Sequence, residues 1–511
     1  MNLLIRADAS VGMGTGHVMR CLALAQAWQD AGGRAFFAMA ESTPAIDARL
    51  AAEQFEAISI SEKPENMGVT IDLAGQRKAE WVVLDGYQFS SDSQRALKSQ
   101  GLKVLAVDDC GQAGRCVADA VLDQNVSAAE ARYGDREPYT RLLLGPRYAL
   151  LRREFVAWRH WAREVPLHPR RILVVMGGSD PQNVTSRVIQ ALEFADGNQV
   201  GTTIVVGSSN PHFTELQQAA ARSKAKLQLV RDPQSLPDLM ADADVAISAA
   251  GSTCWELCLL GLPALLIDIA PNQTALAREL HQRRCAIYLG DPSVAPQTIA
   301  QQLHSLIASQ QCRKTLSQNC RELVDGNGAR RVVSALREGK CMWLRPLTGQ
   351  DSSLLFEWVN DPEVRAVSFS SEDVTWQAHS QWFEKKLASI ATGESAIFVA
   401  EDEDGTPIGQ IRFDSRTDGE WEVDVSLSAA VRGRGFGGEL IRRGVRIMRE
   451  KGNAGRVHAF VKPSNAASVK AFERSAFRRQ GAESVAGHDT VHLINAASEN
   501  DVVASPNRGR N

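Results

Sequence analysis

Short apolar runs alternate with stretches of helical length through the first 340 residues, and this alternation constrains the fold most. A helix between two strands carries the chain back to the end of the sheet where the first strand began, so the two strands run parallel. We therefore expect parallel sheets with helices between their strands. The expected strands are Leu3–Ala7, Ala35–Met39, Trp81–Asp85, Val104–Val107, Ile172–Met176, Thr203–Val206, Val245–Ser248 and Ala264–Ile267.

The same order restarts in the middle of this region. A charged segment at residues 153–170 ends in VPLHPRR and reads as a hinge. RILVVMGGSD follows it and repeats the strand–glycine–helix order of the N-terminus. The repetition predicts two Rossmann-like α/β domains, at residues 1–160 and 161–340, with a ligand cleft between them.

A different order begins near Cys341. Helices around 353–358 and 376–386 are followed by strands at 396–400, 408–413 and 421–427 in hairpin-like order. A helix to about residue 449, a strand at 457–461 and one more helix complete the pattern. This order predicts an α+β domain at 341–496 with a largely antiparallel sheet. The polar stretch at 497–511 is expected to be a disordered tail.

Composition excludes several classes of function. The formal net charge of −3 gives no field that would attract a nucleic acid. No apolar run is long enough to span a bilayer, and Met1 is followed by a strand rather than a signal peptide, so no membrane association is expected. Nine cysteines without a regular spacing favour reduced thiols and a cytoplasmic location. The sequence gives no signal for the oligomeric state.

The stretch VGMGTGHVMR joins the first strand to the first helix. Gly14 and Gly16 would let the backbone approach a phosphate. A dinucleotide fingerprint would have glycine where His17 stands, although Glu41 could supply its acidic residue, and an incidental histidine on a tight turn is a second alternative. In the catalytic alternative, the positive end of the helix dipole keeps His17 neutral, so it could accept a proton. Arg20, on the same helix face, could pair with a phosphate.

Several segments together resemble the hydrolase family of pseudaminic acid synthesis: RADASVGMGTGHVMRCLALA, LDGY, VDD, GGSD and SAAGSTCWELCLLGLP. That family removes UDP from UDP-2,4-diacetamido-2,4,6-trideoxy-β-L-altropyranose, has the two-domain GT-B fold and works without a metal. The likeness spans roughly residues 1–335 and implies that His17 positions or activates water against the anomeric carbon. It also implies that Asp8 and Tyr87 shape the sugar site. From the residues alone, Asp8 could equally be a turn residue and Tyr87 a half-buried core aromatic.

Two glycine loops in the second expected domain are candidates for binding the nucleotide. GGSDPQN can present the N–H groups of Gly177, Gly178 and Ser179 to a diphosphate, unless it is a simple connecting turn. SAAGSTCWE repeats the arrangement, with Ser252 and Thr253 at the start of the next helix. Fixed N–H dipoles in such loops would stabilise the charge that develops as UDP leaves.

Three further residues near these loops are candidates for substrate binding. The resemblance implies that Glu256 holds the ribose hydroxyls, whereas the pattern Thr253-x-x-Glu256 also fits a helix capping box. Asn272 and Gln273, in APNQT, could face the sugar or diphosphate, with helix capping by Asn272 as the alternative. No cluster has a convincing metal spacing, so no metal is expected.

A third glycine loop lies in the C-terminal domain. The pattern R-x-x-G-x-G in VRGRGFGGELIRRGVR resembles the acetyl-CoA loop of GNAT N-acetyltransferases, and VHAFVKPSNAASVKAFERSAF resembles the last third of that fold. The resemblance implies acetyl-CoA as cosubstrate, with its pyrophosphate on the loop backbone at the helix N-terminus. An ordinary glycine turn is the alternative. The residues implied in binding are Arg432, Gly433, Arg434, Gly435, Phe436, Gly437, Gly438 and Asn465.

The sequence departs from the GNAT pattern at two positions. Ala476 stands where a glycine usually precedes the terminal phenylalanine, and Phe472 aligns with the tyrosine that often protonates the departing thiolate. These departures leave the expected fold and cosubstrate intact but leave the general acid unassigned. Glu422 and Asp424 could relieve the attacking amine of its proton, or could be solvated strand residues.

Together these patterns predict a bifunctional enzyme. The C-terminal domain would acetylate the 4-amino group of a UDP-4-amino-4,6-dideoxy-sugar, and the N-terminal pair would hydrolyse the diacetamido product to UDP and free sugar. The alternative is a GT-B glycosyltransferase acting on a UDP-amino sugar, with a non-catalytic GNAT-like module. His488 and His492 have a metal-like spacing, but on a strand they stand about 13 Å apart, too far for a chelate.

Overall fold

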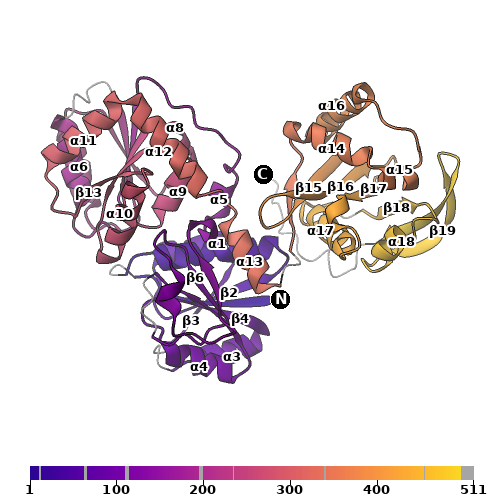
Figure 1. The fold of residues 1–511 in the computed structure, drawn as a ribbon, viewed down its shortest axis with the longest axis horizontal. Coiled ribbons are helices and arrows are strands. Elements are labelled where there is room, and N and C mark those ends of the chain that lie inside the picture. Colours follow the sequence, from indigo (N-terminus) through magenta and orange to yellow (C-terminus); the bar gives the residue numbers. More distant parts are fainter. Residues whose placement is uncertain are drawn as a thin grey trace, which may run out of the picture. The chain divides into compact units, whose positions relative to one another are not determined.

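The computed structural model describes residues 1–10, 13–61, 66–109, 114–194, 200–233, 235–338, 341–453 and 455–496. The expected disordered tail at 497–511 lies outside the described residues, as do Val11 and Gly12 of the first glycine loop. The chain divides into two compact units, residues 1–338 and residues 339–511 (Figure 1). In the parts of the chain that are described, no helix has both the length and the apolarity needed to cross a bilayer.

The first sheet of unit 1 is parallel throughout, with strand order β3-β2-β1-β4-β5-β6-β7. The strand order reverses beside β1, and ligands of such sheets bind outside the carboxyl ends of the strands at this point. Its strands are β1 (Asn2–Ala7), β2 (Arg34–Met39), β3 (Glu56–Ser59), β4 (Ala79–Asp85), β5 (Lys103–Val107), β6 (Ala120–Asp123) and β7 (Arg141–Leu144). Its helices are α1 (Gly16–Asp30), α2 (Pro44–Ala52), α3 (Gly68–Gln76), α4 (Ser91–Ser99) and α5 (Arg153–Val156).

The second sheet is also parallel, with strand order β10-β9-β8-β11-β12-β13. Its strands are β8 (Arg171–Val175), β9 (Gly201–Val206), β10 (Leu227–Arg231), β11 (Val245–Ala249), β12 (Ala264–Ile267) and β13 (Ile287–Gly290). The helices are α6 (Val184–Phe194), α7 (Phe213–Arg222), α8 (Leu236–Asp242), α9 (Thr253–Leu259), α10 (Thr274–Gln282), α11 (Pro296–Ala308), α12 (Gln310–Leu323) and α13 (Gly328–Leu336).

The last helix of unit 1 returns to the first sheet. Helix α13 packs against α1, although its residues fall in the segment expected to form the second domain. A β-carbon at Gly328 would lie 2.2 Å from the carbonyl oxygen of Ala149, so only glycine permits this close approach. The two sheets are therefore joined both by the chain before β8 and by α13.

Unit 2 holds one mixed sheet with strand order β14-β15-β16-β17-β18-β20-β19. All its neighbouring strands are antiparallel except β17 and β18. Its strands are β14 (Trp343–Pro346), β15 (Ser395–Glu401), β16 (Pro407–Ser415), β17 (Trp421–Leu427), β18 (Val457–Val461), β19 (Arg478–Val485) and β20 (His488–Asn495). Its helices are α14 (Ser352–Val359), α15 (Pro362–Val367), α16 (Trp376–Thr392), α17 (Phe436–Glu450) and α18 (Ala466–Glu473).

Alternating residues of the sheet in unit 2 pack against different helices. Phe398 and Ala400 of β15 join a core with α17 and α18, whereas Ile397 and Val399 join a core with α14 and α16. Figure 1 shows α14 and α16 on one side of this sheet and α17 and α18 on the other. The parallel pair β17 and β18 is short, because only the first two residues of β17 pair with β18. The two strands then diverge over the rest of β17. The expected fold class, two Rossmann-like sheets followed by an α+β domain, is confirmed.

Candidate functional site

The first candidate site lies at the carboxyl edge of the first sheet, beside β1. His17 is the second residue of α1, Asp85 is the last residue of β4, and Asp109 follows the end of β5. The His17 side chain is buried, and its Nδ1 lies 2.7 Å from Oδ1 of Asp85. The sequence places these residues together because the glycine loop and the ends of neighbouring parallel strands meet at one edge of the sheet.

The charge of Asp85 fixes which nitrogen of His17 carries the proton. Burial alone would raise the pKa of Asp85, but Arg20 and His17 together hold that pKa well below its usual range. An ionised carboxylate only accepts hydrogen bonds, so Nδ1 of His17 must donate. Nη2 of Arg20 is also 3.2 Å from Nδ1, but it donates to Asp85 at 2.6 Å. A neutral His17 then has its lone pair on Nε2, where it can accept a proton.

Arg20 connects two carboxylates beneath His17. Its Nε and Nη2 donate to Asp85 at 2.7 and 2.6 Å, and its Nη1 donates to both oxygens of Asp109 at 2.7 and 2.9 Å. The buried guanidinium of Arg20 therefore bonds to the carboxylates of Asp85 and Asp109. The contact of Arg20 with a substrate phosphate stays a prediction, and the structure gives this side chain the role of holding the carboxylates in place.

Tyr87 and Asn272 form a polar contact between the two sheets of unit 1. The Tyr87 hydroxyl donates to Asp109 at 3.2 Å and accepts from Nδ2 of Asn272 at 2.8 Å. Tyr87 is 49% exposed and its ring meets the His17 ring edge-on with centroids 5.3 Å apart, so it is no core aromatic. Asn272 lies in a 3-10 turn, Pro271–Gln273, ahead of α10, and its side chain caps no helix. Oε1 of Gln273 accepts from the backbone of Ile269 at 3.0 Å.

The first and second glycine loops face each other. Gly14 has a φ of +80° and Gly177 a φ of +74°, conformations that favour glycine. Among the described residues, apart from the chain neighbours, no atom lies within 4 Å of where a β-carbon would stand at Gly14 or Gly16. A β-carbon at Gly178 would lie only 3.1 Å from Oγ1 of Thr15, which brings the loop of the second sheet against that of the first. Half-buried Ser179 follows directly.

Asp8 follows the end of β1, but its hydrogen-bond partners are not His17, Asp85 or Tyr87. Its carboxylate accepts from Nη1 of Arg6 at 2.6 Å, from the backbone of Ala40 at 2.7 Å and from Nε2 of Gln88 at 3.0 Å. These contacts join the end of β1 to the segments that follow β2 and β4. None of them reaches His17, and a role for Asp8 in sugar binding stays a prediction.

The structure rules out the capping-box explanation of Glu256. The N-cap of α9 is Ser252, whose side chain makes no capping hydrogen bond, and Thr253 is the first helical residue. Oε1 of Glu256 instead accepts from Nη2 of Arg152 at 2.7 Å. Burial raises the pKa of Glu256 although Arg152 opposes the shift. The ribose-binding role of Glu256 stays a prediction.

The third glycine loop begins where β17 has left β18. Gly433 and Gly435 have φ values of +73° and +89°, and Gly435 is the N-cap of α17. Arg432 anchors the loop, because its Nε donates to the carbonyl of Leu427 at 3.0 Å and its Nη1 to Asp361 at 3.0 Å. The guanidinium of Arg434 lies over the ring of Phe436.

The remaining GNAT-like positions have ordinary packing partners. A β-carbon at Gly437 would lie 3.7 Å from Leu427, and one at Gly438 would lie 3.4 Å from Nη1 of Arg442, both ordinary van der Waals distances. Asn465 caps α18 through a bond from the backbone of Ser468 at 3.1 Å. Phe472 is buried against another phenylalanine, so it is a core residue.

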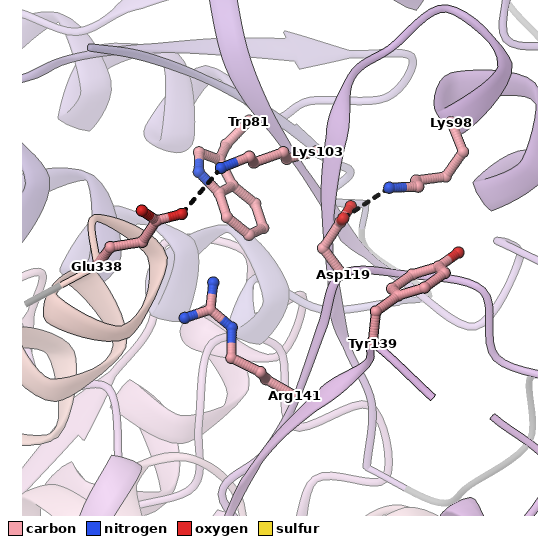
Figure 2. A pocket seen from close by; sticks show the side chains of 7 residues that line it. All are labelled: Trp81, Lys98, Lys103, Asp119, Tyr139, Arg141 and Glu338. Atoms are coloured by element: carbon pink, nitrogen blue, oxygen red, sulfur yellow. Dashed lines mark hydrogen bonds and ion pairs between the residues drawn. The ribbon is translucent and has the colours of Figure 1, made fainter. Parts of the chain in front are cut away.

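A cavity of about 300 Å³ lies at the other edge of the first sheet and contains none of the expected site residues (Figure 2). Ion pairs span it, from Lys98 to Asp119 at 2.6 Å and from Lys103 to Glu338 at 3.3 Å. The lining residues are Trp81, Lys98, Lys103, Asp119, Tyr139, Arg141 and Glu338. Among the residues whose placement is described, no group of three or more His, Cys, Asp or Glu side chains could hold a metal ion.

Sequence reasoning identified His17 but assigned no role to its partners Asp85 and Asp109. Both stand in quoted motifs, LDGY and VDD, at the ends of expected strands. A carboxylate at the carboxyl end of a strand next to the glycine loop was the signal that could have found them. The pairing of Arg152 with Glu256 spans 104 residues, and no local pattern indicates it.

Two models of known protein families match separate parts of this chain. Residues 172–331 match the Glycosyltransferase family 28 C-terminal domain, and residues 342–478 match the Acetyltransferase (GNAT) domain. An uncharacterised protein of Methanocaldococcus jannaschii is 22% identical over 496 residues, 94% of this chain and 97% of that protein.

Two relatives resemble unit 1. The spore coat polysaccharide biosynthesis protein SpsG of Bacillus subtilis is 26% identical over 344 residues, 66% of this chain and 98% of that protein. The UDP-2,4-diacetamido-2,4,6-trideoxy-β-L-altropyranose hydrolase of Campylobacter jejuni is 27% identical over 285 residues, 55% of this chain and 97% of that protein. The resemblances expected from the motifs are confirmed: the chain combines a GT-B-like part related to UDP-sugar enzymes with a GNAT domain.

Proposed function

We propose that unit 1 hydrolyses UDP-2,4-diacetamido-2,4,6-trideoxy-β-L-altropyranose to UDP and free sugar. The hydrogen bond between His17 and Asp85 carries this proposal, because it gives a neutral imidazole a defined proton-accepting nitrogen at the switch point of the sheet. The similarity to the hydrolase of Campylobacter jejuni supports the substrate, since that relative is matched over 97% of its length.

In this mechanism His17 acts on water rather than on the sugar. Nε2 takes a proton from the water as its oxygen forms a bond to the anomeric carbon. The bond from that carbon to the UDP oxygen breaks, and both electrons leave with UDP. Asp85 holds the Nδ1 proton throughout and stabilises the imidazolium that forms. Tyr87 and Asn272, which are hydrogen-bonded to each other beside His17, would contact the sugar.

The leaving nucleotide would lie on the loops of the second sheet. Backbone N–H groups at Gly177, Gly178 and Ser179 would stabilise the diphosphate as its charge increases. Glu256 would accept hydrogen bonds from the ribose hydroxyls, with Arg152 holding its carboxylate in place. None of these contacts requires a metal ion.

Unit 2 would use acetyl-CoA to acetylate the 4-amino group of a UDP-4-amino-4,6-dideoxy-sugar. The match to the GNAT domain and the glycine-rich loop ahead of α17 support this activity. The loop from Arg432 to Gly438 would hold the pyrophosphate, and the divergence of β17 from β18 would admit the thioester between them. The product of this reaction would be the substrate, or a precursor of the substrate, of unit 1.

A second candidate for unit 1 is glycosyl transfer to an acceptor other than water. The match of residues 172–331 to a glycosyltransferase domain favours it. The same histidine could then deprotonate an acceptor hydroxyl. The two candidates differ in whether UDP is released when no acceptor is present.

The test measures UDP release from the UDP-diacetamido sugar in ¹⁸O-labelled water without an acceptor. Hydrolysis at the anomeric carbon predicts rapid release of unlabelled UDP, and His17→Asn should slow it by at least about 100-fold. His304→Asn, at an exposed position of α11, is the matched control and should leave the rate unchanged. Labelled UDP would mean attack at phosphorus, and UDP release that depends on an added acceptor would favour the transferase.

A further inference from the structure

The cavity at the amino ends of the strands of the first sheet is lined by more positive than negative side chains (Figure 2). Lys103 and Arg141 are the first residues of β5 and β7. The His17 site lies at the carboxyl ends of the strands, so the cavity is a separate place on the same sheet. The cations of the cavity are Lys98, Lys103 and Arg141, and its anions are Asp119 and Glu338.

One ion pair of the cavity is held in place by the fold. Nζ of Lys98 lies 2.6 Å from Oδ1 of Asp119, and the other oxygen of that carboxylate accepts from the backbone N–H of Val104 at 2.7 Å. Lys98 also lies over the ring of Tyr139, 5.0 Å from its centroid. The charges of Lys98 and Asp119 therefore cancel, and both side chains have partners. A ligand would find its contacts on the other side of the cavity.

Three donors from different strands line that other side. The indole N–H of Trp81, on β4, is fully buried and has no hydrogen-bond partner among the described residues. Nζ of Lys103 lies over the same indole, 5.6 Å from the ring centroid. Nη1 of Arg141 donates to the carbonyl of Ala335 at 2.6 Å, and none of the described carboxylates forms an ion pair with this guanidinium. A buried N–H without a partner costs free energy, so a ligand that accepts from it would give the donor a reason to be there.

Glu338 is the one anion on this side among the described lining residues. Its carboxylate lies 3.3 Å from Nζ of Lys103, and its side chain is 71% exposed. Figure 2 draws the indole nitrogen of Trp81 on the side of the ring where these two side chains meet. An exposed ion pair of this kind stabilises a fold very little, because water screens it. A bound anion can therefore replace Glu338 beside Lys103 without disturbing the packed sheet.

The charges around this position indicate which anion would bind. With the carboxylate of Glu338 turned to solvent, Lys103 and Arg141 present two positive charges that nothing else in the cavity balances. A single carboxylate would balance one of them, which Glu338 already does. A phosphate monoester carries close to two negative charges at pH 7, and its oxygens can accept from an ammonium, a guanidinium and an indole N–H together.

We propose that this cavity binds the phosphate group of a small metabolite, with Lys103, Arg141 and the indole N–H of Trp81 as donors. The phosphate takes the place of the Glu338 carboxylate, and the ligand is bound without being converted. A volume of about 300 Å³ is at the lower end for a ligand pocket, which suits a phosphate carrying a group no larger than a sugar ring. The inference does not rest on the activities proposed for either unit, because the cavity shares no residue with their sites.

Calorimetric titration of the full chain with glucose 6-phosphate tests this inference. UDP and coenzyme A are present throughout, so that the other expected phosphate sites are filled. Lys103→Met and Arg141→Met should each weaken binding about tenfold or more, because each removes a charge-assisted hydrogen bond. Glu338→Gln should tighten binding about two- to fivefold, because it removes the competing carboxylate. Glu322→Gln, at an exposed position of α12 outside the cavity, is the matched control and should leave the affinity unchanged.

Two comparison ligands identify the chemistry that is recognised. Glucuronate, a sugar acid with one negative charge, should bind about tenfold more weakly than glucose 6-phosphate, because one positive charge stays unbalanced. Inorganic phosphate separates the two sources of the same group. If it binds as tightly as the ester, free phosphate is the ligand, whereas tighter binding of the ester means that the sugar ring is also bound; the site stands in both cases.

Three results would overturn the inference. The first is the absence of binding by either phosphate at millimolar concentrations, which would mean that the cavity holds only water. The second is binding that Lys103→Met and Arg141→Met leave unchanged, which would place the ligand elsewhere. The third is equal binding of glucuronate and glucose 6-phosphate, which would contradict the charge argument. If either cation variant fails to fold in thermal unfolding, Glu338→Gln decides: this exposed substitution must tighten binding, or the inference fails.

Discussion

Replacing Asp85 by asparagine tests the mechanism at its most specific contact. Asp85 accepts four hydrogen bonds, one from His17, two from Arg20 and one from Sγ of Cys21. The asparagine amide would offer one acceptor and one donor group in the same space. Arg20 donates to both oxygens of Asp85, so either orientation of the amide sets its NH2 group against one Arg20 N–H; the orientation with the amide nitrogen at the Oδ1 position also points an N–H at Nδ1 of His17. In that orientation the proton of His17 would move from Nδ1 to Nε2, where it blocks the nitrogen that must accept the water proton.

The expected loss of activity is large. An asparagine in the corresponding place of a Ser-His-Asp triad lowers kcat by about 10⁴, because the histidine adopts the wrong tautomer. We expect a loss of UDP release between about 10² and 10⁴ for Asp85→Asn at pH 7. The stability cost should be near 3 kcal/mol, the lower end for breaking a buried ion pair, because Arg20 keeps both bonds to Asp109.

The dependence of this stability difference on pH has a definite sign. The folded-state pKa of Asp85 is depressed, so its ion pair stabilises the fold above the pKa of an unfolded aspartate, about 4, and the benefit is lost as pH falls through the lower folded value. The gap in unfolding free energy between wild type and Asp85→Asn should therefore be constant from pH 5 to 8 and should narrow below about pH 4.

The assay combines UDP release, measured by chromatography, with thermal unfolding and with acetyl transfer by unit 2 as an internal control. Asp109→Asn is the matched variant, because it removes the other carboxylate of Arg20 without touching Nδ1 of His17. It should cost similar stability and much less activity. A folded Asp85→Asn with near-normal UDP release, or equal losses of activity in both variants, would refute the assigned tautomer.

Four other substitutions test separate contacts. Gly437→Glu should abolish acetyl-CoA binding in calorimetry, because a carboxylate would stand against the pyrophosphate; unchanged binding contradicts the loop assignment. Glu256→Gln should weaken UDP binding about tenfold by removing charge-assisted bonds to the ribose. If the variant has a lower Tm but binds UDP normally, Glu256 stabilises the fold and does not bind the ribose. Asn272→Ala should raise KM for the UDP-sugar two- to tenfold at unchanged Tm, roughly the value of one hydrogen bond. Ala476→Gly should raise the unfolding free energy by about 1 kcal/mol, because the residue has a φ of +63°; a lower Tm would show that the alanine is unstrained.

Most strands of unit 1 that sequence inspection predicted are buried on both faces. β4 and β11 read as continuous apolar runs because helices cover both sides of a parallel sheet. The edge strand β3 was missed, since its four residues EAIS are mostly exposed. β19 was missed for the same reason, because its sequence RRQGAESV is nearly all exposed and becomes a strand only by pairing with β20.

The candidate sites were predictable only as far as a local pattern reaches. His17 stands in a glycine loop at a helix start, so its position in the sequence already indicates its chemistry. Its partner Asp85 is 68 residues away and becomes a partner through the order of strands in the sheet. The cavity donors Trp81, Lys103 and Arg141 come from three strands, and their meeting depends on the order of β4, β5, β6 and β7 in the sheet, which no spacing in the sequence reveals.

The chain has a glycine turn at the start of several helices, and the side chains of the neighbouring strand determine the chemistry that each turn supports. A glycine turn at the start of a helix offers N–H groups and a positive dipole, which is enough to bind an anion. The same device becomes catalytic at α1, because β4 ends in a carboxylate that fixes the proton of His17. At α17 the strand before the loop provides no such side chain to the helix. Its base candidate, Glu422, lies further back along β17, where that strand separates from β18, so chemistry there depends on the substrate reaching into the sheet.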